Sequence, residues 1–195
     1  MDSRITVGIT GGIGAGKSIV CRILSIMGYP VFYSDLSARE ILENHPEAIQ
    51  QVTALFGPEA YLDNRLNRTE IARQVFADTQ KRNALNHITH PLVRAAFQSW
   101  HQTQKSRIVF NEAAILFETG AYKNFDYTLL VTAPESTRIK RVMLRDKTAL
   151  QQVKERLDAQ WPDEQKIPLA SFTIFNDDVH ALIPQIQQTL LKLNA

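Results

Sequence analysis

The stretch GITGGIGAGKSIV, residues 8–20, decides the fold. The alternating apolar residues of 5–9, just before and into it, predict a short buried strand. The apolar residues of 18–27 recur at helical spacing, so a helix follows at once. Residues 11–18 fit the pattern G-x-x-x-x-G-K-[ST] on this strand-to-helix turn, which is typical of a phosphate-binding loop. The alternative is a glycine-rich turn that only caps the helix.

The residue types in this loop suit phosphate chemistry. Glycine adopts positive φ and lets a ligand approach the backbone, and successive N–H groups at a helix N-terminus bind phosphate oxygens. Lys17 adds a positive charge at the β and γ phosphates, and the Ser18 hydroxyl is placed to bind Mg²⁺. We therefore expect nucleotide contacts from Gly11, Gly12, Gly14, Ala15, Gly16, Lys17, Ser18 and Ile19.

The composition is that of a globular protein in a reducing compartment. The 195 residues are 44% hydrophobic and 22% charged, with a net charge of +2. No run of 18 apolar residues is present, so no transmembrane helix is expected. The N-terminal MDSRITVGIT enters a predicted strand within a few residues, which leaves no room for a secretory signal. Cys21 is the only cysteine, which excludes an intramolecular disulfide, and we expect it to be buried in a cytoplasmic protein.

Five short apolar segments rich in β-forming residues are separated by helical patterns. Several are almost continuously apolar, as expected for strands covered on both faces. Their alternation with helices predicts an α/β fold, a three-layer arrangement around a central parallel sheet of five strands. The segments are 4–10, 30–34, 107–113, 127–132 and 172–176.

Two long excursions interrupt this minimal core. Residues 36–105 are far more than one crossover needs, and they predict several helices with breaks near 44–46, 56–58, 63–65 and 90–91. Insertions at the strand ends of such a sheet build acceptor pockets and lids. We therefore expect a nucleotide-binding core of 1–35, 106–134 and 171–195, a helical acceptor-binding insertion of 36–105 and a helical lid of 135–170.

Asp35 is a carboxylate that the chain returns to the phosphate-loop end of the sheet. The helix after the loop and the strand of 30–34 cover similar lengths, so Asp35 falls at the same edge as the loop. A carboxylate there can accept the proton of an attacking hydroxyl or hold Mg²⁺ through water. It can equally be the N-cap of a helix over Leu36–Leu42. Spacing alone leaves these roles open.

The lid region is strongly basic. Residues 138–156 carry seven basic and two acidic side chains, a local net charge of +5. Such a patch on a nearly neutral protein favours a small polyanionic ligand over a nucleic-acid duplex. Arg138, Arg141 and Arg145 fall on one side of one predicted helix, where guanidinium groups can bind phosphate oxygens. A solvated helix face is the alternative.

The motifs that the sequence lacks exclude two classes of nucleotide-binding protein. The sequence contains neither N-K-x-D nor D-x-x-G, which a GTPase would carry, and it lacks the transporter-type L-S-G-G-Q. A small kinase with an acceptor domain and a lid remains. A nucleotide-gated binding module, which would need no small acceptor, is the alternative from another class.

An ordered set of motifs resembles the dephospho-CoA kinase family over most of the chain. The resemblance begins with the phosphate loop and continues with Asp35-Leu36-Ser37-Ala38-Arg39, similar to the family's D-x-x-A-R. The other matching positions, in chain order, are Phe56-Gly57, Leu66-Asn67-Arg68, Val75-Phe76, Ile88–Val93, Leu116-Phe117-Glu118, Arg138, Arg141, Arg145-Asp146, Gln160 and Asn176.

The resemblance implies phosphorylation of the ribose 3′-hydroxyl of dephospho-CoA by ATP with Mg²⁺, the last step of coenzyme A biosynthesis. Asp35, Lys17 and Arg141 would be catalytic, with Arg145 and Asn176 completing the ATP site. The acceptor would be bound by Asp35, Arg68, His90, Leu116 and Glu118. The expected partners are these two small molecules, without nucleic acid or membrane, for a monomer or weak homo-oligomer. Another small-molecule or nucleotide kinase of the same architecture is the alternative.

Several candidates also have a structural interpretation. His90 precedes Pro91 and can be a helix-break residue, Arg68 can cap a solvated helix, and Glu118 can be an exposed loop residue. The sequence also departs from the family pattern, with Tyr33 where a second aspartate is usual and Asp177-Asp178 where a small residue or glycine follows the asparagine. Two further departures are Ala114, where a proline is expected, and Ser171, where an aspartate is common.

Overall fold

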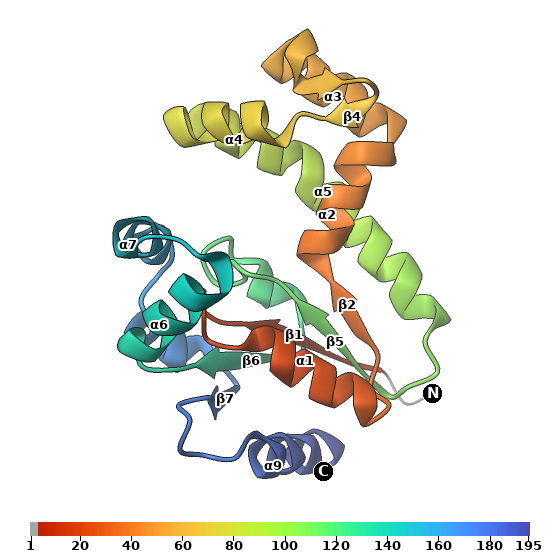
Figure 1. The fold of residues 1–195 in the computed structure, drawn as a ribbon. Helices are drawn as coiled ribbons and strands as arrows, with labels where there is room; N and C mark the ends of the chain where they lie inside the picture. Colours follow the sequence, from red (N-terminus) through yellow and green to blue (C-terminus); the bar gives the residue numbers. More distant parts are fainter. Residues whose placement is uncertain (1–3) are drawn as a thin grey trace. The chain divides into compact units, whose positions relative to one another are not determined.

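The computed structural model describes residues 4–195, which form two compact units. The first unit contains the chain up to Phe32 together with Gln104–Ala195, and the second contains Tyr33–Thr103. Each unit has its own apolar core. Figure 1 shows the strands and their helices in the first unit and a group of helices in the second.

The first unit is built on a five-stranded sheet with strand order β2-β5-β1-β6-β7. The pairs β1–β5, β1–β6 and β6–β7 are parallel. All five predicted strands are present within one or two residues of their expected ends, and the predicted α/β class with a central parallel sheet is confirmed. The strands are β1 (Ile5–Thr10), β2 (Val31–Tyr33), β5 (Ile108–Glu112), β6 (Tyr127–Thr132) and β7 (Phe172–Phe175).

Helices α1 (Lys17–Ile26) and α9 (Leu182–Asn194) pack against each other and against the sheet. Their buried side chains join those of β1 in one core, to which Cys21 belongs. Burial, together with the Glu112 carboxylate, raises the pKa of the Cys21 thiol to about 12, so this buried thiol stays protonated. Helices α6 (Glu135–Asp146), α7 (Leu150–Asp158) and α8 (Asp163–Lys166) lie between β6 and β7 in the chain.

The second unit is mainly helical and closes around Val52, Phe56, Ala60 and Ile71. Three predicted breaks are confirmed, since helices end at Asn44 and Phe56 and a turn lies at 63–64. That turn joins the two-residue strands of a small hairpin, and both of its residues have positive φ. The elements are α2 (Ser34–Asn44), α3 (Pro46–Phe56), β3 (Tyr61–Leu62), β4 (Arg65–Leu66), α4 (Arg68–Ala77) and α5 (Thr79–Thr103).

The predicted break at His90–Pro91 is wrong. Helix α5 runs for 25 residues with Pro91 inside it. A proline in a helix interior removes one backbone hydrogen bond and costs about 3 kcal/mol. Packing of α5 against α2, α3 and α4 offsets this cost. The break that the sequence reading missed is at Asp78, whose carboxylate accepts hydrogen bonds from the N–H groups of Gln80 and Lys81 and so caps α5.

Candidate active site

The phosphate loop joins β1 to α1 in a conformation that requires glycine. Gly14 and Gly16 have φ of 78° and 97°, in the left-handed region. A Cβ on Gly16 would lie 2.0 Å from the Asn176 side-chain nitrogen, which leaves no room for any other residue. That same nitrogen donates a hydrogen bond of 2.8 Å to the Ala15 carbonyl. The segment after β7 therefore supports the loop directly.

Lys17 is the first residue of α1, and its side chain folds back over the loop. Its Nζ donates a hydrogen bond of 2.8 Å to the Gly11 carbonyl and lies 4.0 Å from Oε1 of Glu112 at the end of β5. Only 14% of the side chain is exposed, so the ammonium group is held at one place. Ser18 and Ile19 follow on the exposed side of α1. The loop thus presents backbone N–H groups, an ammonium group and a hydroxyl in one region.

Arg141 reaches the same loop from α6. Its guanidinium donates to the Gly14 carbonyl at 3.4 Å and to the Asn176 side-chain oxygen at 3.5 Å. It also forms an ion pair of 2.6 Å with Asp178, one of the two aspartates that depart from the family pattern. Asp178 is 72% exposed, and exposed ion pairs contribute little. The arginine is therefore available for exchange from a carboxylate to a phosphate oxygen.

The other two arginines of the predicted stripe are each paired with an aspartate. Arg138 is buried and lies 3.8 Å from the Asp163 carboxylate. Arg145 is exposed and binds the neighbouring Asp146 through two hydrogen bonds of 2.7 and 3.0 Å. Those bonds and a third from Arg156 hold the pKa of Asp146 well below its usual range. Of the three arginines, Arg141 donates a hydrogen bond to the phosphate loop, and Arg138 packs against Gly12 of the loop while paired with Asp163.

Leu116 and Glu118, both expected to contact the acceptor, point into the first unit. Leu116 is 2% exposed, and a Cβ on Gly8 would lie 2.6 Å from its methyl group. The Glu118 carboxylate forms an ion pair of 2.9 Å with the fully buried Lys166 and accepts a hydrogen bond from the Trp161 N–H. In this conformation Leu116 is a core residue and Glu118 is a structural anchor.

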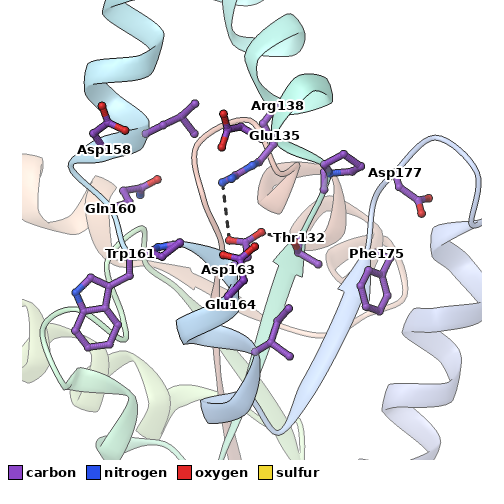
Figure 2. A pocket seen from close by; sticks show the side chains of 15 residues that line it. Thr132, Glu135, Arg138, Asp158, Gln160, Trp161, Asp163, Glu164, Phe175 and Asp177 are labelled. Atoms are coloured by element: carbon purple, nitrogen blue, oxygen red, sulfur yellow. Dashed lines mark hydrogen bonds and ion pairs between the residues drawn. The ribbon is translucent and has the colours of Figure 1, made fainter.

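Side chains from residues 132–177 line a pocket of about 580 Å³. Figure 2 shows the lining side chains of this pocket from close by. The paired Arg138 and Asp163 point into its middle, with Gln160 and Trp161 to one side. Sequence reasoning missed Asp163 and Lys166, because the polar run that contains them matches no motif. In this segment Gln160 matches the family pattern, whereas Asp163 and Lys166 match none of its quoted motifs.

The remaining predicted residues belong to the second unit. Asp35 lies in the first turn of α2 and is exposed. Helix α2 begins at Ser34 with Tyr33 as its N-cap, so the alternative in which Asp35 is the N-cap is wrong. Arg68 begins α4 behind the N-cap Asn67 and forms an exposed ion pair of 2.6 Å with Glu43. His90 lies in the middle of α5. Partial desolvation, Arg94 and His87 together lower the pKa of its imidazole, which favours a neutral ring.

The residues near Lys17 fit a magnesium–nucleotide complex. Mg²⁺ prefers oxygen ligands, keeps several waters and is usually held by one or two protein groups with substrate phosphates. The exposed Ser18 hydroxyl at the start of α1 is such a group, and the Glu112 carboxylate, 13% exposed, lies at the adjacent strand end. The Ser18 hydroxyl and the Glu112 carboxylate thus provide oxygen ligands of the kind that Mg²⁺ prefers, on the loop side of the sheet.

Together, the parallel sheet, the glycine loop and the arginine at its mouth define a phosphate-loop kinase. The fold is shared by shikimate kinase from Acinetobacter baumannii, which is 14% identical over 99% of this chain and 94% of that one, with a TM-score of 0.52. The chain belongs to the dephospho-CoA kinase family, whose pattern it matches over residues 5–181.

Individual relatives agree with this assignment. The dephospho-CoA kinase of Bacteroides fragilis is 36% identical over 97% of this chain and 93% of its own length. That of Chlorobaculum tepidum is 38% identical over 97% and 96%. A dephospho-CoA kinase structure from Campylobacter jejuni is 27% identical over 97% of this chain and 94% of that one, with a TM-score of 0.67. The chain is therefore a kinase of this family, as predicted.

Proposed function

We propose that the chain transfers the γ-phosphoryl group of ATP to the ribose 3′-hydroxyl of dephospho-CoA, which gives coenzyme A and ADP. The observation that carries this proposal is the meeting of Lys17, Arg141 and Asn176 at one phosphate loop, in a chain of this family. A nucleotide-gated binding module has no small acceptor and would not need a carboxylate such as Asp35. Another small-molecule kinase would keep the loop and differ in its acceptor residues.

The phosphate loop binds the triphosphate in this mechanism. Its N–H groups and the start of α1 stabilise phosphate oxygens, and the Lys17 ammonium neutralises charge on the β and γ groups. When bound, Mg²⁺ would supply further neutralisation of phosphate charge, and the Ser18 hydroxyl would hold it. Asn176 acts on the loop backbone through Ala15, which fixes the shape that receives the nucleotide.

Asp35 orients the acceptor hydroxyl and takes its proton. Its carboxylate is exposed at the start of α2, directly after β2, so it is open to a ligand. Phosphoryl transfer needs a group that positions the attacking oxygen in line with the leaving group. Arg68 and His90 are the proposed acceptor contacts on the second unit. The exposed Arg68–Glu43 pair can exchange for an acceptor phosphate because it is worth little in water.

Arg141 neutralises charge that develops on the transferring phosphoryl group. Arg141→Ala should lower kcat about ten- to a hundredfold, the scale of a hydrogen bond to a charged group, and should raise KM for ATP by less. Steady-state kinetics with varied ATP would measure both constants. Lys140→Ala removes an exposed charge from the same helix and should leave both near the wild-type values. An Arg141→Ala protein with intact kcat and raised KM would make the arginine a ground-state binding residue.

The proposed partners and cellular location follow from the same interpretation of the chain as a small-molecule kinase. Within residues 4–195, no helix combines the length and the apolar character that crossing a bilayer demands. We propose ATP and dephospho-CoA as the partners, without nucleic acid or membrane, for a cytoplasmic monomer or weak homo-oligomer. The small positive net charge, concentrated near the lid, suits a compact polyanion such as a nucleotide.

A panel of acceptors tests the substrate. ADP release would be followed with ATP and Mg²⁺ in the presence of dephospho-CoA, adenosine, AMP or shikimate, and without acceptor. We expect rapid release with dephospho-CoA and only slow hydrolysis otherwise, because lid closure around the correct acceptor excludes water. Equal release with another alcohol would assign the chain to a different kinase reaction. Acceptor-independent hydrolysis alone would favour a nucleotide-gated module.

A further inference from the structure

The segment of residues 160–166, called the anchoring segment below, contacts the phosphate loop from behind. It follows α7 and contains α8. The Gln160 side-chain oxygen accepts a hydrogen bond of 2.8 Å from the backbone N–H of Ile13, near the tip of the loop. Its side-chain nitrogen donates to the Ala114 carbonyl, 3.4 Å away, in the turn after β5. One amide thus joins the loop to the neighbouring strand end, which needs a donor and an acceptor on the same side chain.

The anchoring segment is itself held at both ends by one carboxylate. Oxygen Oε1 of Glu118 pairs with Lys166 at 2.9 Å and accepts the Trp161 N–H at 3.2 Å. Lys166 is 0% exposed. A buried ion pair contributes little to net stability, but loss of one partner is costly because it leaves an uncompensated buried charge. The Glu118–Lys166 pair therefore resists displacement of the segment.

A second connection runs from the middle of the segment to the loop. The Thr132 hydroxyl donates to the Asp163 carboxylate, and the other carboxylate oxygen lies 3.8 Å from Nη1 of Arg138. Figure 2 shows the two contacts as dashed lines. A Cβ on Gly12 would lie 2.0 Å from that same guanidinium nitrogen, so Arg138 packs directly against the loop. The anchoring segment thus supports two successive loop residues, Gly12 and Ile13.

We propose that Gln160 is a positioning residue for phosphoryl transfer, holding the tip of the phosphate loop in its nucleotide-binding shape through the Ile13 N–H. This role rests on the proposed kinase function and adds a residue that does not touch the substrate. A loop ordered before ATP arrives binds it without the cost of ordering, and it keeps its N–H groups aimed at the developing charge. Small displacements of such groups reduce the rate strongly.

Two substitutions at Gln160 separate positioning from simple packing. Gln160→Met keeps the length and removes both hydrogen bonds, whereas Gln160→Glu keeps an oxygen that can accept the Ile13 N–H. We expect Gln160→Met to lower kcat/KM for ATP about ten- to a hundredfold, the scale of a slightly misplaced group, with KM for dephospho-CoA unchanged. Gln160→Glu should recover part of that loss. Gln165→Met, an exposed glutamine of the same segment, is the matched control and should behave as wild type.

The exchange rate of the Ile13 amide hydrogen is the direct readout, measured by NMR without any acceptor. We expect slow exchange in the wild type and in Gln160→Glu, and exchange about tenfold faster or more in Gln160→Met, because the local bond is lost. Binding of a non-hydrolysable ATP analogue should weaken in the same order. Unfolding temperatures would be recorded for all four proteins.

The outcomes are distinct. Fast Ile13 exchange in the wild type, or full activity in Gln160→Met, would overturn the positioning role. If Gln160→Met does not fold, Gln160→Glu still decides, since a protected Ile13 amide with only a partial loss of affinity for the analogue is required. Failure of the wild type to phosphorylate dephospho-CoA would overturn the proposed substrate instead, and the exchange and analogue measurements would remain valid.

Discussion

Lys17→Ala is expected to reduce kcat by about 10³-fold while the protein remains folded, because the ammonium group stabilises charge on the transferring phosphoryl group. The substitution leaves the strand and the helix start intact, since alanine is a strong helix former and Lys17 is the first residue of α1. Its Nζ contacts are to the Gly11 carbonyl and, at 4.0 Å, to Glu112. Turnover of ATP with dephospho-CoA measures the effect, and thermal unfolding checks the fold.

Arg22→Ala is the matched control for Lys17. Arg22 is an exposed basic residue on the same helix, one turn further along, so its removal changes the net charge by the same amount. Its turnover should stay within about twofold of wild type, as for most surface substitutions. A Lys17→Ala protein that retains a third of the wild-type turnover would contradict the phosphate-loop mechanism.

Asp35→Asn should lower kcat by about 10²-fold or more, the usual scale for loss of general-base catalysis. Asparagine preserves the shape of the side chain and removes its charge and basicity. Since Asp35 lies in the first turn of α2 without a capping bond, the change costs at most about 0.3–1 kcal/mol of helix-dipole stabilisation. Affinity for ATP should be retained, because the phosphate-loop contacts belong to the first unit.

Glu47→Gln provides the comparison for Asp35. Glu47 lies in the first turn of α3, so this change removes an equivalent charge from a neighbouring helix of the same unit. The two variants should lose similar amounts of stability, and only Asp35→Asn should lose turnover. Thermal unfolding, ATP titration and turnover would be measured side by side. Near-wild-type turnover in a stable, ATP-binding Asp35→Asn protein would exclude Asp35 from the mechanism.

The sheet and the phosphate loop could be predicted from local patterns. Buried parallel strands are continuous apolar runs, and the glycine loop has a fixed spacing, so both leave a signal within a few residues. Pro91 shows where this fails. Its local preference is to end a helix, but packing of α5 on three other helices outweighs that preference, and packing is invisible along the sequence.

The sequence predicts where a side chain lies when its place along a strand or helix decides this. It does not predict the place of a side chain that an ion pair with a distant residue decides. Lys17 and Asn176 reach the loop as expected, since they follow strands of one sheet. Arg138 had the right helical spacing for a phosphate contact, but Asp163 neutralises it inside the protein. Glu118 likewise binds Lys166. The partners Asp163 and Lys166 lie in one polar run, and no sequence pattern in that run predicts either pairing.

Two of the side chains that hold the phosphate loop, Gln160 and Asn176, come from late in the chain. Gln160 bonds to a residue 147 positions before it, and Asn176 bonds to one 161 positions before it. During synthesis the glycine loop leaves the ribosome early, yet it lacks these supports until β7 has been made. Contacts of such long range also form slowly during folding. The nucleotide-binding shape is thus completed only when the first and last strands share one sheet, and ATP stabilises by mass action the chains that have reached this state.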